Sequence, residues 1–179
     1  MKMTDGEKLI ALMLADISKR LQGKPEVDPD FVAHTIYADQ LWGFDWQFSG
    51  IAFERSEKPN PVVTETVEIL EMFSSTMYQF QRLDQSERKQ VRDDLGYTAH
   101  GLDIFPGFDS NHDPHYGVAN YLVQDLHRFK DVPGASNNSH TQTSLPRYRK
   151  MLKAYLPMRT KLSAGRFSKE DIIAIFNGG

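Results

Sequence analysis

The apolar residues between positions 63 and 80 recur at the spacing of one face of an α-helix. They step along the chain by four, three, three, four and three residues: Val63, Val67, Leu70, Phe73, Met77 and Phe80. This period places all of them on one side of a helix. Asn60 and Pro61 precede the run, as an N-cap residue and a first-turn proline would. The pattern predicts a helix over 61–83, about 35 Å long at 1.5 Å per residue.

Six further segments carry the apolar stripes and start or stop signals of helices. They cover about 5–22, 29–41, 85–94 and 114–129, a segment capped by Ser144 that Pro157 ends or kinks near Leu156, and a terminal segment opened by Ser168. Residues 42–48 fit the period of a strand and of a helix alike. We favour a helical or irregular turn there, because no partner strand is evident. The sequence therefore predicts an all-α fold, one domain over 1–179, with six or seven helices bundled around the 61–83 helix.

The first segment carries an apolar face but is no membrane span. Its apolar residues repeat at helical spacing: Leu9, Met13, Ile17 and Leu21, with Ile10 and Leu14 beside them. Asp16 interrupts the run, whereas a span needs about 20 predominantly apolar residues. No small-residue cleavage site follows it, so it does not read as a signal peptide. We expect a cytoplasmic protein without a membrane partner.

Two stretches read as loops. The connector 96–111 is rich in glycine and proline and is long for a loop without secondary structure. The stretch 131–143 is the most polar part of the chain, and we expect it to be the most mobile.

Composition excludes several chemistries. Apolar residues make up 40% and charged residues 25% of the 179, which is typical of a globular chain. There is no cysteine, so disulfide scaffolds, thiolate metal sites and thiol nucleophiles are excluded. Neither the Gly-x-Ser-x-Gly pattern nor a glycine-rich phosphate loop is present. These absences favour a protein that is not an enzyme, and we predict no cofactor.

Histidines and aspartates gather in and just after the 96–111 connector. Six fall within sixteen residues, and four of them are the candidate metal ligands: His100, Asp109, His112 and His115. Imidazole and carboxylate groups suit zinc or iron(II). A metal-dependent enzyme at 100–115 is therefore one alternative. The other interpretation is that these histidines hydrogen-bond to the backbone or face solvent.

The net charge of −3 conceals a strong asymmetry. Residues 126–169 contain ten basic side chains and one acidic one, so they carry +9 and the rest of the chain carries −12. This asymmetry predicts an anionic partner such as a nucleic acid or another polyanion. The candidate anion-binding residues are Arg147, Arg149, Lys150, Lys153 and Arg159. The alternatives are a solvated face, or docking of this face onto the acidic half of the same or a neighbouring subunit.

Short segments spread along the chain resemble one protein family. They are Met3-Thr4 leading into Glu7-Lys8-Leu9-Ile10, Ile69-Leu70-Glu71-Met72-Phe73, Gly107-Phe108-Asp109, Tyr148-Arg149-Lys150-Met151-Leu152, Leu162-Ser163-Ala164 and Glu170-Asp171-Ile172-Ile173. In this order they resemble the YfbU family. The resemblance implies a bacterial, cytoplasmic and mostly helical protein, and it provides no catalytic residue to transfer.

The functional expectation combines these points. We expect a non-enzymatic helical binding or regulatory protein that forms a homo-oligomer, since its methionines and aromatic segments would permit a subunit interface. The alternatives are a nucleic-acid binder that uses 126–169 and a metal-dependent enzyme at 100–115.

Overall fold

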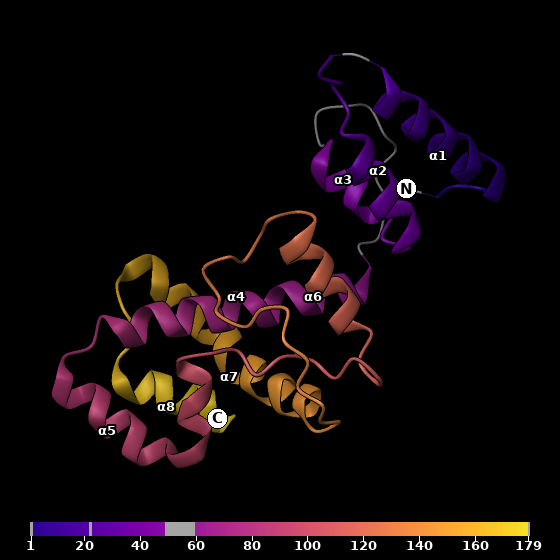
Figure 1. Cartoon of the computed structure of the whole chain (residues 1–179). Coiled ribbons are helices and arrows are strands. Elements are labelled where there is room, and N and C mark those ends of the chain that lie inside the picture. The colour runs from indigo at the N-terminus through magenta and orange to yellow at the C-terminus, as the bar shows by residue number, and fades with distance from the viewer. Residues whose placement is uncertain (1, 22, 49–59, 179) are drawn as a thin grey trace.

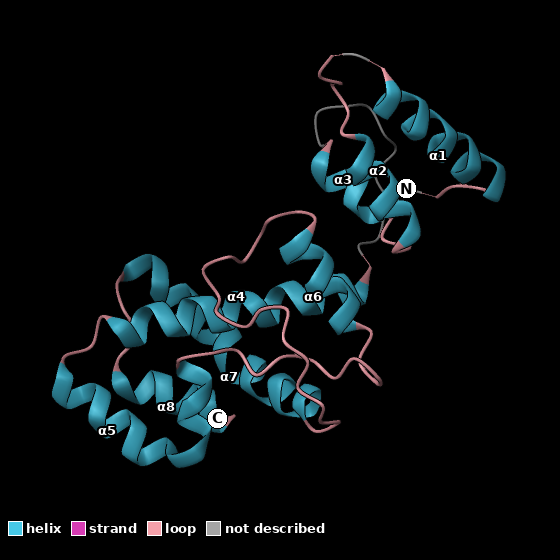
Figure 2. Ribbon diagram, viewed as in Figure 1, coloured by secondary structure: helices cyan, strands magenta, loops and turns pink. Residues whose placement is uncertain are grey.

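The chain is all-α, as predicted. The structure is a computed structural model that describes residues 2–21, 23–48 and 60–178. Within these ranges it contains helices and loops but no strand, and one isolated bridge joins Phe108 to Asn138 (Figure 2). The elements are α1 (Asp5–Arg20), α2 (Pro29–Tyr37), α3 (Trp42–Gln47), α4 (Pro61–Gln81), α5 (Gln85–Leu95), the 3₁₀ helix η1 (Gly96–Leu102), α6 (His115–Gln124), α7 (Ser144–Ala164) and α8 (Lys169–Asn177).

The predicted central helix is α4. Asn60 caps it by accepting a hydrogen bond from the backbone N–H of Val62 at 2.9 Å, with Pro61 in the first turn. Packed against it are α6, α7, η1 and α8 (Figure 1). Its side chains Ile69, Leu70 and Phe73 are almost completely buried at the centre of the main hydrophobic cluster.

The first three helices form a second, smaller cluster. Phe31, Ile36 and Phe44 pack there against Tyr121 of α6. Trp42, with Leu126 just after α6, contacts both clusters. Figure 1 shows α1, α2 and α3 together at one end of the molecule, with α1 outermost. The two clusters are thus joined through α3 and α6, and α1 lies furthest from the main core.

Several predicted helix boundaries are confirmed. The segments 5–22, 61–83 and 85–94 correspond to α1, α4 and α5. Residues 42–48 include the short helix α3, as favoured. Ser168 caps α8, and Asp171 returns a bond to the cap residue in a capping box. The start of α2 after Asp28 is also confirmed, but this helix ends at Tyr37 rather than near 41.

The predicted helix over 114–129 is too long. α6 covers only His115–Gln124, and the backbone of His127 and Phe129 takes a positive φ of 55°, which a helix cannot contain. At its start no side chain caps the helix. The Asp113 carboxylate instead accepts from the backbone N–H of Asp109 at 3.1 Å. Asp113, which precedes the N-cap residue Pro114, therefore stabilises the preceding turn and does not cap α6.

The predicted start of α7 is wrong. Ser144 does not cap the helix but is its first residue, after an N-cap at Thr143 whose side chain makes no capping bond. Of the two outcomes predicted at Pro157, a helix end is excluded, because the helix continues to Ala164. The apolar side of α7 faces the core, where Tyr148, Met151, Leu152 and Tyr155 are buried.

The two predicted loops are partly ordered by packing. The connector 96–111 begins with η1, and the stretch 131–143 buries Val132 and Ala135 in the main cluster. No helix in the described part of the chain is long and apolar enough to cross a membrane.

Candidate functional site

Asp109 organises the connector between η1 and α6. It is buried, and its carboxylate accepts from the backbone N–H of Asn111 at 2.9 Å and from Nδ1 of His112 at 2.8 Å. These two bonds, the backbone one first, lower the pKa of Asp109 below its ordinary value. Nε2 of His112 then faces the side-chain amide of Gln142 at 2.8 Å. Because the amide donates, the geometry assigns the proton of His112 to Nδ1.

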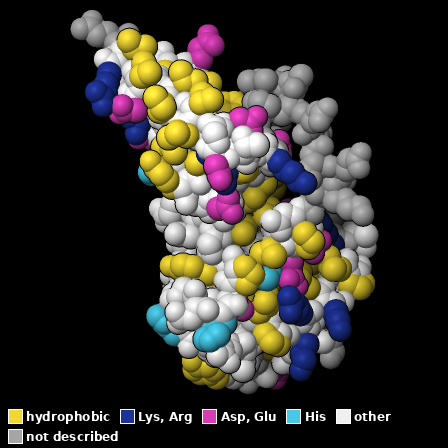
Figure 3. Space-filling model, turned by 90° about the vertical axis from the view of Figure 1, so that its right-hand side faces the viewer, with side chains coloured by type: hydrophobic (Ala, Val, Ile, Leu, Met, Phe, Trp, Pro, Cys, Tyr) yellow, Lys and Arg dark blue, Asp and Glu magenta, His cyan; other side chains and the backbone are white. Residues whose placement is uncertain are grey.

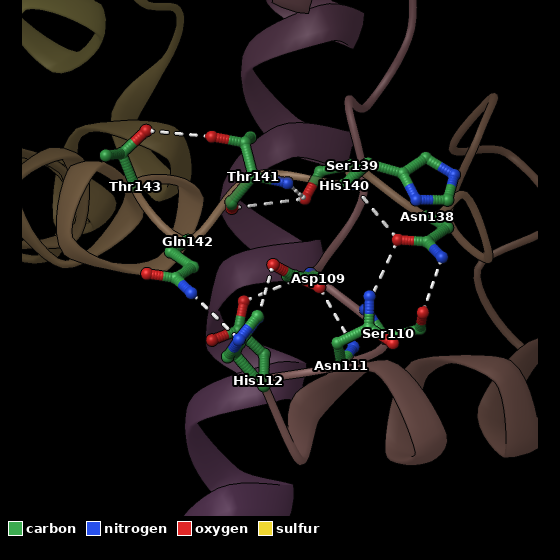
Figure 4. A network of polar contacts seen from close by, with 11 residues as sticks. Asp109, Ser110, Asn111, His112, Asn138, Ser139, His140, Thr141, Gln142 and Thr143 are labelled. Carbon is green, nitrogen blue, oxygen red and sulfur yellow. Dashed lines mark hydrogen bonds and ion pairs between the residues drawn. The ribbon is translucent and has the colours of Figure 1, made fainter.

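A second set of bonds joins the same two loops. The side-chain oxygen of Asn138 accepts from the backbone N–H groups of Ser110 and His140, at 3.2 and 3.0 Å. Figure 4 shows these bonds beside the contact between His112 and Gln142, which links the connector to the chain before α7. The polar side chains here hydrogen-bond one loop to another. Asp109 and His112, predicted as metal ligands, therefore have a structural role.

His115 belongs to a different network. It is buried at the start of α6, where its ring stacks on Phe108 with the centroids 5.4 Å apart. Its Nε2 lies 2.8 Å from the Glu65 carboxylate, which also accepts two bonds from Arg149, at 2.7 and 2.9 Å. Arg149 and then His115 lower the pKa of Glu65 below its ordinary value, although burial opposes them. Glu65 thereby connects α4, α6 and α7.

The four predicted metal ligands are therefore not brought together. Asp109 and His112 are in contact, His115 is bonded to Glu65, and His100 lies in η1 beside a shallow hollow lined by Arg92 and Asp103. Across the described residues, no three histidine, aspartate or glutamate side chains are placed to share one metal ion. The clustering of these residues in the sequence reflects two separate hydrogen-bond networks and a third position, that of His100 beside Asp103.

The predicted anion-binding residues also divide. Arg149 is bonded to Glu65, and Arg159 forms an ion pair with Glu71 at 2.8 Å. Arg147 is partly buried. Lys150 and Lys153 are exposed. The basic helix α7 thus uses two of its arginines to dock on the acidic side of α4, which is one of the alternatives expected from the charge asymmetry.

A hollow of about 980 Å³ lies between α4, α7 and the segment 126–131. Several polar groups on its walls are bonded to one another. Arg159 pairs with Glu71, the Tyr155 hydroxyl donates to Ser75 at 3.1 Å, and Ser74 bonds to Asp131. The exposed side chains of His127 and Arg128 also line the hollow, and Arg128 lies over the Trp46 ring at 5.3 Å from its centroid. A ligand that used Arg159 or Tyr155 would have to break bonds that already exist.

Among the described residues, the exposed large apolar side chains are concentrated on α1. Six side chains, each between 51% and 67% exposed, form what we call the α1 face. They are Leu9, Ile10, Met13, Leu14 and Ile17 of α1, with Leu21 at its C-cap. Only the opposite side of the helix, with Leu12 and Ala15, packs inward. Figure 3 shows the hydrophobic side chains gathered over the upper part of the molecule, where this helix lies. Exposed apolar patches are typical of interaction surfaces in other proteins.

Sequence reasoning found the residues of the α1 face but missed their exposure. The sequence signal that could have revealed this exposure was the width of the apolar surface around the helix. A surface helix of a globular domain needs one apolar stripe. α1 has Leu12 and Ala15 for α2 and a second, separate stripe for which the described residues supply no partner.

A comparison with family models shows which protein family the chain belongs to. A model of the YfbU domain matches residues 1–178. The chain belongs to the YfbU domain family. No curated protein and no solved structure matches it. The family match thus confirms the resemblance seen in the sequence, and the function of this YfbU domain is argued from its own surface.

Proposed function

We propose that this YfbU-domain protein is a non-enzymatic, self-associating helical protein of the bacterial cytoplasm, which binds further copies of itself through the α1 face. The observation that carries the proposal is the exposure of six apolar side chains on one helix. Removing such side chains from water is favourable by about 25 cal/mol per Å² of apolar surface. The protein therefore gains free energy from covering this face.

The shape of the α1 face favours a protein partner over a small molecule. Small-molecule sites are concave and bury most of the ligand. The α1 face is the outer side of a helix at the edge of the molecule (Figure 1). It suits the packing of another helix, because helices pair through apolar stripes of this kind.

The two alternatives gain less support. Nucleic-acid binding would need the basic side chains of α7 to be free, and Arg149 and Arg159 are engaged with α4. Binding of a polyanion would then depend on Lys150, Lys153 and Arg147. A metal-dependent reaction would need the 100–115 residues to converge, which they do not in this structure.

Sedimentation velocity over a range of micromolar concentrations tests the proposal. The wild-type chain is expected to sediment as a dimer or larger species that dissociates on dilution. Leu14→Glu and Ile17→Glu each place a charge in the middle of the α1 face, so both variants are expected to remain monomeric. Their circular dichroism should match that of the wild type, since neither side chain contributes to the buried core.

Tyr97→Glu is the matched control. Tyr97 is 92% exposed and lies on η1, away from α1. The same change from an exposed apolar residue to a charge should leave association unaltered there. A wild-type chain that stays strictly monomeric at high micromolar concentration would contradict the proposed function.

A further inference from the structure

We infer that two copies of this chain pair through α1 in antiparallel orientation, with Leu14 of one copy packed against the partner's Ile17. This inference rests on the proposed function and adds the orientation and register of the pair. It depends on three observations: the spacing of the exposed residues, the distribution of charge along α1, and the way α1 is fixed to α2.

The spacing of four exposed residues is symmetrical. Ile10, Leu14, Ile17 and Leu21 follow one another at intervals of four, three and four residues. Ile10, Leu14 and Ile17 therefore form a seam along one side of α1, and Leu21, the C-cap residue, follows at its end with extended backbone angles. Paired helices interleave the side chains of such seams. The intervals read the same in both directions. A helix turned end to end therefore presents the same seam, with Leu14 opposite the partner's Ile17 and Ile10 opposite the partner's Leu21.

Charge and the helix dipoles favour the antiparallel orientation. The first turn of α1 contains Asp5 and Glu7. Its last turn contains Arg20, which pairs with Asp16 on the same helix, and Lys19, which is engaged with Asp30 of α2. A parallel pair would place acidic ends together and basic ends together. An antiparallel pair brings the acidic end of each helix toward the basic end of the other and opposes the two helix dipoles, which is favourable.

The helix is fixed so that the seam faces outward. Lys8 forms an ion pair with Asp39 at 3.3 Å, and Lys19 forms one with Asp30 at 2.5 Å, both on the side of α1 that packs on α2. Thr4 and Glu7 cap the helix reciprocally. The backbone of α1 is thus ordered before a second copy binds, and association need not include the cost of folding it.

The available area suits a weak, reversible pair. The four seam side chains, each burying roughly 100 Å² on contact, offer on the order of 400 Å² per copy, which is half of the roughly 800 Å² per partner in a standard interface. The interface is of isologous type, because each copy contributes the same surface. It closes a dimer and leaves no second α1 face open for further growth.

Cysteine pairing tests the orientation directly, since the chain contains no cysteine. Leu14→Cys and Ile17→Cys are purified separately, mixed in equal amounts and oxidised with oxidised glutathione. The measurement is the intact mass of each disulfide-linked dimer. Only facing residues lie close enough for a disulfide. The mixed Leu14→Cys/Ile17→Cys dimer is expected to exceed the share of about half that random pairing gives.

A second pair and a control complete the experiment. Ile10→Cys mixed with Leu21→Cys should behave in the same way, and Tyr97→Cys should form few disulfides alone or in any mixture. If the wild type associates but each variant links mainly to itself, the antiparallel register is overturned while self-association stands. If the wild type does not associate at all, the proposed function itself is overturned.

Discussion

A single carboxylate, that of Glu65, joins three helices through its bonds to His115 and Arg149. Glu65→Gln removes the negative charge while keeping the shape of the side chain. We expect it to lower the free energy of unfolding at pH 7 by about 1 to 2 kcal/mol, since hydrogen bonds to charged groups contribute more than neutral ones but this site is partly exposed. Urea titration followed by circular dichroism measures the change. Glu68→Gln is the control, because the described part of the chain shows no ion pair for Glu68.

The pH dependence of this effect has a definite sign. The folded-state pKa of Glu65 lies below its ordinary value near 4.5. The carboxylate therefore contributes stability above that ordinary value and loses it as the pH falls through the lowered pKa. The difference in free energy of unfolding between wild type and Glu65→Gln should be largest at pH 7 and should shrink toward pH 3. A difference that grows on acidification would contradict this role of Glu65.

Gly43 is the position where α3 and α6 approach most closely. A Cβ atom there would lie 2.1 Å from the Tyr121 hydroxyl oxygen and 2.7 Å from its ring. That hydroxyl also bonds to Thr35 at 2.6 Å, so it cannot move freely. Gly43→Ala should therefore cost about 2 kcal/mol of stability through overpacking. In Gly117→Ala on α6 the new methyl group would have nothing within 4 Å, and we expect a gain of about 0.5 to 1 kcal/mol in the same unfolding assay.

At the scale of elements, the two loops around Asp109 depend on each other. Gly107 has a φ of +100°, and a Cβ atom there would lie 2.1 Å from the carbonyl oxygen of Asn137. The backbones of Phe108 and Ser139 are hydrogen-bonded beside it. Gly107→Ala should separate the loops, so amide hydrogen exchange measured by mass spectrometry should accelerate in 105–114 and 132–143 together. Gly96→Ala, with a positive φ but no close neighbour, is the control and should alter only its own surroundings.

The helices whose ends are determined by local chemistry could be predicted from the sequence. α4 begins after Asn60-Pro61 and α8 after Ser168 because a side chain there satisfies free backbone N–H groups. The end of α6 could not be predicted. Leu126 and Phe129 continue its apolar period, but they pack from a turn in which His127 and Phe129 have left-handed backbone angles. The packing of these side chains in the hydrophobic clusters outweighs the preference of the sequence for a helix there.

The sequence indicated which residues form the candidate site but not how they pair. Asp109, His112 and His115 are close in the sequence, yet the turn at Asp113 and the start of α6 direct His115 toward Glu65 on another helix. Which partner each histidine finds depends on helix packing, and the local pattern contains no information on it. For the α1 face the apolar residues were identified, whereas their exposure depends on which side of α1 lies against α2.

At the scale of the molecule, part of the charge asymmetry is neutralised internally. The basic stretch 126–169 and the acidic helix α4 meet in the pairs of Arg149 with Glu65 and Arg159 with Glu71. The net charge of −3 therefore describes a molecule whose two halves partly neutralise each other. The surface that we propose for self-association is accordingly apolar rather than charged.

Association through such a surface must also affect thermal stability. A partner that binds the folded chain and not the unfolded one stabilises it, by about 2.7 kcal/mol when its concentration is 100 times the dissociation constant. The melting temperature of the wild type should therefore rise with protein concentration in differential scanning calorimetry. Leu14→Glu should melt at a temperature independent of concentration and equal to that of the wild type at high dilution, because Leu14 is 60% exposed and contributes little to the folded monomer. A variant that melts far below the dilute wild type would instead show that Leu14 stabilises the monomer itself.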